Sequence, residues 1–151
     1  PVGVMPILML LAGGSMCVGN YLGGVLSDRF TPARVSMLTQ LVACLSLLSI
    51  FLMASYAWLS LLLMCITTGC LFALSSPQQL LLLRHSPGGE LMGGAMVQLA
   101  FNLGNALGAF FGGLPIDAGW GVRYSALIGS LFALVGTLVF VVFIRRYERN
   151  E

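Results

Sequence analysis

Charged residues are scarce in this chain, which has no lysine, a single histidine and only 8% charged residues over its 151 positions. Water-soluble domains carry about 25% charged residues. No soluble core could hide a chain that is 58% hydrophobic with a mean hydropathy of +0.98. The composition therefore excludes a soluble domain. It also argues against a nucleic-acid partner, because the formal net charge is only +2 and no lysine is present to build a basic patch.

Side chains that catalyse reactions or bind metals are nearly absent as well. The sequence has no Ser/His/Asp set, no pair of carboxylates within one apolar stretch and no Gly-rich phosphate loop after a strand. Cys17, Cys44, Cys65 and Cys70 lie within apolar stretches at spacings that do not suit a metal site, so apolar packing is the simpler interpretation. His85 is expected to be a solvated connector residue rather than a ligand. We predict no enzyme, no metal site and no cofactor.

Five apolar stretches of about 20 residues are each long enough to cross the ~30 Å hydrocarbon layer as a helix. They cover residues of about 5–26, 35–54, 58–82, 91–115 and 122–144. We therefore predict an all-α integral membrane protein with five transmembrane helices, which has the lipid bilayer as its surroundings.

The arginines are expected to gather on one side of the membrane. If the spans alternate in direction, the connectors after the first and third spans share a face with the C-terminal tail. That face holds Arg29, Arg34, Arg84, Arg145, Arg146 and Arg149, and only Arg123 lies opposite. Because arginine near span ends stays cytoplasmic, the N-terminus of the chain is expected outside and the tail inside. An external start at Pro1 and an odd number of spans lead us to expect further helices upstream.

Small residues recur at helical spacing along one stripe of the first span, where they allow another helix to approach closely. The stripe consists of Ala12, Ser15, Gly19, Gly23 and Ser27. We predict helix packing through Gly19 and Gly23.

The third span carries an unusual polar load around a proline. Its polar and small residues are Thr67, Thr68, Gly69, Ser75, Ser76, Gln78 and Gln79. Pro77 should loosen the helical hydrogen-bond ladder, which is tolerated only where protein or water lies adjacent. Gln78 is therefore a candidate residue of a solute path.

Amides and glycines form two separate stripes on the fourth span. At ~100° per residue, Gln98, Asn102 and Asn105 fall on one stripe, whereas Gly93, Gly104, Gly108 and Gly112 fall on another. The amides could line a water-filled path for a polar solute or could bond to neighbouring helices, and the sequence favours neither. For the glycines at 104, 108 and 112, helix packing is preferred over a hinge or sliding surface.

Polarity is thus uneven among the spans, since the first, third and fourth carry glycines, amides and a proline while the second and fifth are plain. This inequality predicts that three spans line a cavity and two face lipid.

The first connector resembles a family signature. Gly24 to Arg29 reads Gly-Val-Leu-Ser-Asp-Arg, with Arg34 following, and is similar to the major facilitator superfamily loop Gly-x-Leu-Ala-Asp-Arg with basic residues beyond it. The stretch 31–33 departs from the Gly-Arg-Arg expected there. The resemblance implies that Asp28 and Arg29 bias a gate, by pairing with a neighbouring helix end. The alternative is a topology signal and surface charge alone.

A longer resemblance covers residues 71–113, in which Leu-Phe-Ala-Leu-Ser-Ser-Pro-Gln-Gln and Gly-Gly-Glu-Leu lead into Ala-Phe-Asn-Leu-Gly-Asn-Ala-Leu-Gly-Ala. With Gly-Asn-Tyr-Leu-Gly-Gly at 19–24, it extends over nearly the whole chain. This looks like the arabinose-efflux-permease-like branch, among the drug:proton antiporters. The resemblance implies a twelve-helix fold of inverted repeats, of which this chain is helices eight to twelve, with eight, ten and eleven lining the cavity.

We therefore expect part of a proton-coupled efflux transporter of the bacterial inner membrane, which moves a small polar or amphipathic solute, a sugar or a drug. The coupling carboxylate is expected in a missing N-terminal helical half, because no acidic residue lies in the middle of a span here. The alternative from another class is a non-transporting membrane assembly module or the product of a truncated gene.

Overall fold

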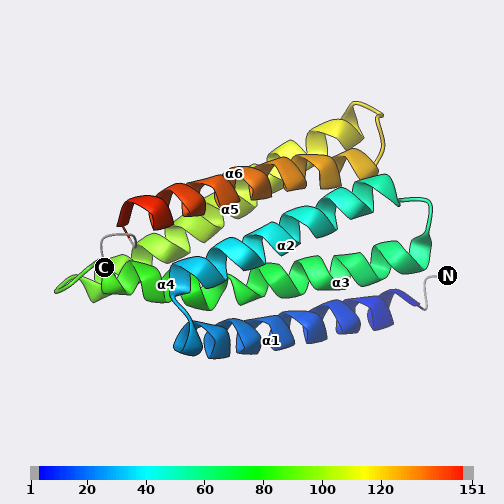
Figure 1. Ribbon diagram of the computed structural model, residues 1–151. Coiled ribbons are helices and arrows are strands. Elements are labelled where there is room, and N and C mark those ends of the chain that lie inside the picture. The colour runs from blue at the N-terminus through cyan, green and yellow to red at the C-terminus, as the bar shows by residue number, and fades with distance from the viewer. Residues whose placement is uncertain (1–3, 148–151) are drawn as a thin grey trace.

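The computed structural model describes residues 4–147, and the regular elements in that range are all helices (Figure 1). They are α1 (Met5–Arg29), α2 (Pro32–Leu52), α3 (Ala57–Ala73), α4 (Ser75–Arg84), α5 (Glu90–Asp117) and α6 (Arg123–Tyr147). Five spans are long and apolar enough to cross a membrane, because α3 and α4 together form one span. The prediction of an all-α protein with five transmembrane helices is confirmed.

The third span is divided at Leu74, between the end of α3 and the start of α4. Pro77 has no N–H to donate to the carbonyl of Ala73 four residues earlier. The ladder resumes at once, since the Gln78 N–H donates to the Leu74 carbonyl at 3.1 Å. Leu74 itself keeps helical angles, with φ −70° and ψ −28°. The division is therefore a local interruption at a single turn residue, after which the chain continues in helical conformation.

Prolines lie in the first turn of α1 and of α2, at Pro6 and Pro32, where a missing N–H costs nothing. The connector between these helices is only residues 30–31, although the polar sequence suggests a connector over 27–34. It is shorter because α1 stays helical to Arg29, where a basic residue in the last turn is favoured by the helix dipole.

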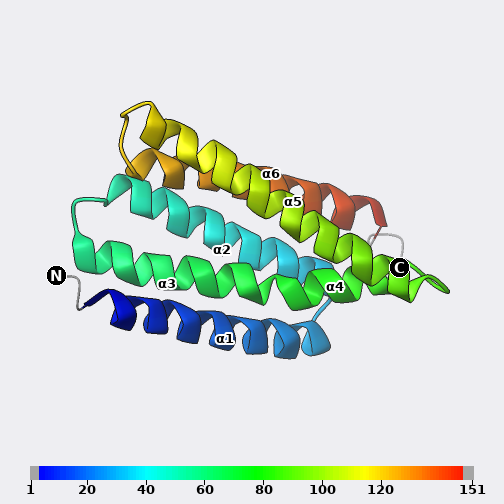
Figure 2. The ribbon, with the colours of Figure 1, turned by 180° about the vertical axis from the view of Figure 1, so that it is seen from behind.

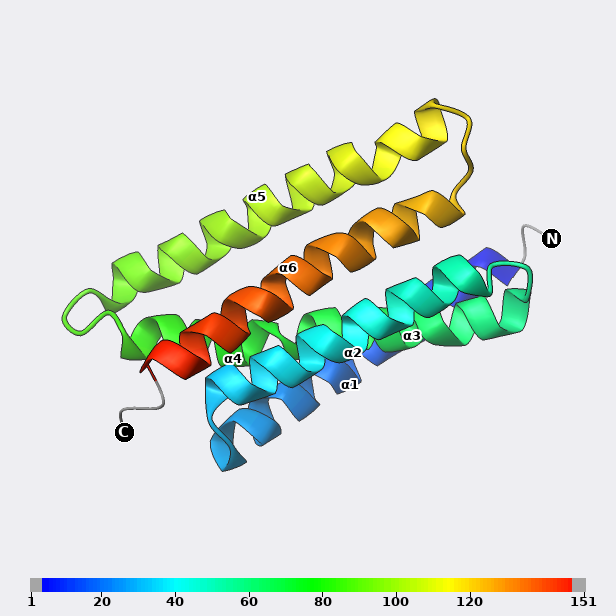
Figure 3. The same ribbon diagram turned by 45° about the horizontal axis from the view of Figure 1, so that its top comes forward.

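The spans form an open row. α6 packs on α2, α2 on α3 and α3 on α1, while α5 lies against α6 and α4. Figure 2 shows α1 at one edge of this row, and Figure 3 shows α5 at the other. Over residues 4–147, α1 and α5 make no contact with each other, so each has a long side that no other described helix covers.

The most closely packed seam lies between α2 and α6, the two plain spans. Ala43 and Cys44 of α2 and Ala133 of α6 are buried there. The Cys44 thiol donates to the Ser130 carbonyl at 3.3 Å, and the Gln40 amide donates to the Ala133 carbonyl at 3.4 Å. The few small and polar residues of these spans therefore face each other, which leaves most of their leucines, valines and phenylalanines exposed.

α1, α4 and α6 end, and α2 begins, at one end of the row (Figure 1), and all but one of the arginines among the described residues belong to these helix ends. Helix ends there carry Arg29, Arg34, Arg84, Arg145 and Arg146, and we call this the arginine-rich end. Arg123 begins α6 at the opposite end, whereas Arg149 lies outside the described residues. That the arginine-rich end faces the cytoplasm remains a prediction from the distribution of arginine.

Candidate functional site

Two glycines of α1 lie directly against the backbone of α3. A Cβ at Gly19 would overlap the carbonyl of Gly69, and a Cβ at Gly23 would overlap the carbonyl of Ala73. Both α1 glycines are buried. Only residues without a side chain allow two helices to approach this closely, so the first-span stripe meets α3. The Ala73 carbonyl that faces Gly23 is the one that Pro77 leaves without its helical partner.

Hydroxyls and an amide accompany this close approach. Ser15 and Thr68 lie 3.0 Å apart between their hydroxyl oxygens. Further along, the Ser76 hydroxyl donates to the side-chain oxygen of Asn20 at 3.2 Å. The Ser75 hydroxyl lies 3.1 Å from the same oxygen and shares its one proton with the Phe72 carbonyl, which is nearer at 2.7 Å. We call Asn20, Ser75 and Ser76 the Asn20 cluster. It joins α1 to the division between α3 and α4, so the local opening of the ladder adjoins a group of polar side chains.

Sequence reasoning did not select Asn20 as a site residue. The sequence does contain a feature that could identify it, because Asn20 is the only amide in the apolar first span and lies within the stretch that resembles the family. A single amide at membrane depth needs a polar partner. The sequence could not show that the partners would be the serines next to Pro77.

The three amides of α5 lie on an uncovered surface. Gln98, Asn102 and Asn105 are all exposed, and the Gln98 amide donates weakly to the Asn102 oxygen at 3.5 Å. Transfer of an amide to hydrocarbon without a hydrogen-bond partner costs roughly 4–8 kcal/mol. This face of α5 therefore requires water or further protein rather than lipid beside it. Of the two interpretations of these amides, bonding to neighbouring helices finds no partner in residues 4–147.

Gln78 lies on α4 beside α5. It is half-buried and lines a cavity of about 280 Å³ together with Val97 and Phe101 of α5 and Phe140 of α6. α4 contacts both α1 and α5. It therefore connects the helix that carries Asn20 with the helix that carries the three amides.

Of the glycine stripe of α5, Gly93 lies against Ser86, whereas the other three glycines face open space in the described part of the chain. A Cβ at Gly104, Gly108 or Gly112 would meet nothing within 4 Å. Helix packing through these glycines therefore stays a prediction. Like the amides, they lie on α5, most of whose surface is not buried by the described residues.

The signature-like residues occupy the arginine-rich end of α1 and α2. Asp28 and Arg29 are exposed in the last turn of α1, and Arg34 is exposed in the first turn of α2. Gly24 lies one turn earlier, with open space where a Cβ would point. Both arginines line a cavity of about 420 Å³ at this end. Their expected effect on a gate stays a prediction.

The chemistry offered at membrane depth is neutral. The Asn20 cluster and the α5 amides supply hydrogen-bond donors and acceptors without charge. Over the described residues, no group of three or more His, Cys, Asp or Glu could hold a metal ion. Such an arrangement suits recognition of a polar solute better than bond making or breaking.

Known proteins resemble the chain along its whole length. It is 38% identical over 147 residues to AraJ, a candidate transporter of Escherichia coli (strain K12), which covers 97% of the chain and 37% of AraJ. It is 31% identical over 151 residues to the inner membrane transport protein YdhP of E. coli O157:H7 and of strain K12, which covers the whole chain and 38% of YdhP. The chain thus spans less than two fifths of the length of these relatives. No family profile and no solved structure matches it.

Proposed function

The chain belongs to the major facilitator superfamily, and on that premise we propose that it forms part of a secondary active transporter that works by alternating access. The solute is a small polar or amphipathic molecule, in the class of sugars and drugs. The transporter lies in the bacterial inner membrane as a multi-pass protein, as the name of YdhP says of that relative. Its N-terminal helical half lies outside this chain and covers the free sides of α1 and α5.

The observation that carries this proposal is the exposed row of amides on α5. Gln98, Asn102 and Asn105 need polar surroundings at membrane depth, and the described residues supply none beyond the weak bond between the first two. A water-filled path satisfies these amides, and a polar solute can exchange hydrogen bonds with them as it passes.

We propose further that transport is efflux coupled to protons, in the manner of the drug:proton antiporters that the sequence resembles. Proton coupling needs an ionisable group within the membrane. The acidic residues of this chain lie at span ends, as Asp28, Glu90 and Asp117 do, or in the tail. The coupling carboxylate therefore belongs to the N-terminal half.

Leucine at Asn102 in the full-length protein tests the proposal. Asn102→Leu removes one amide of the row and should lower solute export severalfold, while membrane insertion stays intact. Ser49→Leu is the matched control, because it places leucine at a hydroxyl that bonds only to its own helix, to the Leu45 carbonyl at 2.8 Å. Export from cells or inverted vesicles and the amount of protein in membranes would be measured together.

Equal export by Asn102→Leu and the wild-type protein would reject the role of the amide row. Absence of export by the wild-type protein, across sugars and cationic drugs, would instead favour the non-transporting membrane assembly module.

A further inference from the structure

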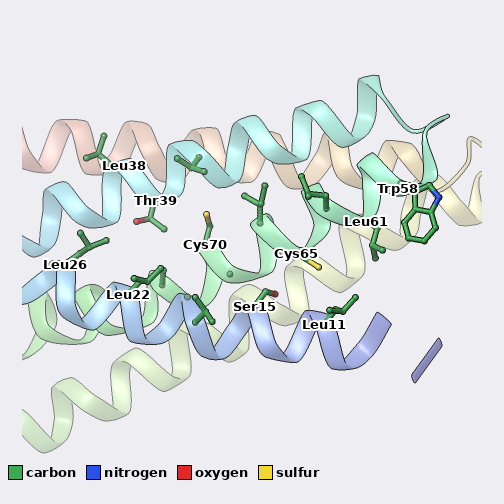
Figure 4. Close-up of a pocket in the computed structure, with 17 residues that line it drawn as sticks. Leu11, Ser15, Leu22, Leu26, Leu38, Thr39, Trp58, Leu61, Cys65 and Cys70 are labelled. Atoms are coloured by element: carbon green, nitrogen blue, oxygen red, sulfur yellow. The ribbon is translucent and has the colours of Figure 1, made fainter. Parts of the chain in front are cut away.

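Two cavities in the structure lie next to each other and share three lining residues, and we call the pair the groove. The larger has a volume of about 810 Å³ and lies between α1, α2 and α3 (Figure 4). The smaller, of about 420 Å³, is the cavity at the arginine-rich end that Arg29 and Arg34 line. Leu26, Leu38 and Thr39 line both. The groove therefore runs from a charged mouth into the apolar depth of the membrane.

The body of the groove offers no free hydroxyl. The Ser15 hydroxyl donates to the Ala12 carbonyl at 2.7 Å, and the Thr39 hydroxyl donates to the Val35 carbonyl at 2.7 Å. The other lining side chains are leucine, valine, isoleucine, alanine, tryptophan and two cysteines, with glycines between them. A polar solute would lose its hydrogen bonds to water there without replacement. The body therefore suits hydrocarbon.

The mouth suits a phosphate group. Arg29 ends α1 and Arg34 lies in the first turn of α2, so the two guanidinium groups border one cavity from opposite helices. A guanidinium presents a planar fork of five N–H donors, which matches phosphate oxygens and can serve more than one acceptor. Phe30, which is exposed, lines the same cavity.

From this juxtaposition we propose that the groove binds an anionic phospholipid, with its phosphate on Arg29 and Arg34 and an acyl chain along the apolar body. One leaflet is about 15 Å deep, half of the ~30 Å hydrocarbon layer, which corresponds to about ten residues of helix. The α1 residues that line the groove extend from Leu26 at its mouth to Leu11. They span about 22 Å of helix, so the apolar body reaches past one leaflet.

The lipid site is separate from the amide row that carries the proposed solute path. It lies between α1, α2 and α3, whereas the amide row lies on α5, which makes no contact with α1 in the described residues. The lipid would hold α1 against α2, the loosest of the seams that α2 makes, and so would bear on the position of the helix that carries the Asn20 cluster.

The test is lipid retention by the full-length protein. The protein would be reconstituted in vesicles of equal parts phosphatidylglycerol and phosphatidylcholine and extracted in mild detergent, and the lipids that remain bound would be identified by native mass spectrometry. We expect retained phosphatidylglycerol to exceed phosphatidylcholine. Joint replacement by Arg29→Gln and Arg34→Gln should lower phosphatidylglycerol retention roughly tenfold, since two charge-assisted contacts are lost.

Two further variants distinguish lipid binding in the groove from a general effect of positive charge at the arginine-rich end. Arg145→Gln with Arg146→Gln removes the same charge at the same end from exposed positions outside the groove, and should retain phosphatidylglycerol. Leu22→Trp fills the body of the groove without a change of charge and should release the lipid (Figure 4). Monodisperse elution in size exclusion would show that each variant is folded.

The proposal is overturned if the Arg29 and Arg34 variant keeps its phosphatidylglycerol, or if the Arg145 and Arg146 variant loses as much. It is also overturned if Leu22→Trp retains the lipid, because a helix of the full-length protein would then be the occupant of the groove. Millimolar inorganic phosphate is the last arm, because displacement of the lipid by phosphate would assign the mouth to a free anion.

Discussion

Replacement of Gly23 by alanine should push α1 away from α3. A Cβ at this position would overlap the Ala73 carbonyl oxygen and would lie 2.8 Å from the carbonyl carbon and from the Cα of the same residue. The obstacle is backbone, which cannot rotate aside as a flexible side chain can. Overpacking of this kind costs about 1–3 kcal/mol, and the better helix propensity of alanine offsets about 0.5–1 kcal/mol. We expect a net loss of about 1–2 kcal/mol in the free energy of unfolding.

Gly24→Ala is the matched control for this loss. Gly24 is the next residue of the same helix, yet a Cβ there would meet nothing within 4 Å. Its replacement should leave stability unchanged or raise it by up to about 1 kcal/mol. Both variants would be unfolded by titration with sodium dodecyl sulfate from mild detergent micelles and followed by circular dichroism. If Gly23→Ala unfolds at the same detergent fraction as the wild-type protein, α1 and α3 do not meet backbone to backbone.

Three further changes address the Pro77 region and the gate. Pro77→Ala restores a donor for the Ala73 carbonyl, and a bond of about 1 kcal/mol should slow amide exchange of the surrounding segment roughly fivefold; unchanged exchange in mass spectrometry would mean that the ladder has no gap there. Asn20→Ala removes the bond from Ser76 and the shared bond from Ser75, and should cost about 1 kcal/mol in the same detergent titration, while a loss no larger than that of Ser49→Ala would count against the cluster. Asp28→Asn should shift the balance of inward-open and outward-open states, and cysteine-accessibility labelling that finds the wild-type populations would disprove the gate.

Hydropathy alone predicts the five spans, because each is apolar on average over a stretch of membrane length. The position of Pro77 likewise predicts where the third span loosens, since the missing N–H is a property of the residue itself. Both inferences succeed because they depend on local chemistry. The departures occur at the ends of spans, where helices such as α1 continue beyond the apolar run.

Contacts between spans could not be predicted in the same way, since they depend on which helices become neighbours. The α1 stripe with Gly19 and Gly23 packs against α3. The similar α5 stripe with Gly104 faces open space in the described residues. The uneven polarity of the spans predicts a plain fifth span that faces lipid, and it gives no role to Ser130 and Thr137. They are buried residues of α6, and the Ser130 carbonyl accepts a hydrogen bond from Cys44 of α2.

The seam between α2 and α6 gives the chain a built-in reporter. The Cys44 thiol is closed between the two helices, whereas Cys17 on α1 is exposed. A thiolate is the reactive form of cysteine and needs access to solvent. A maleimide should therefore reach Cys44 only when α2 and α6 come apart. The rate at which this native thiol reacts would follow the opening of the seam without any label introduced into the protein.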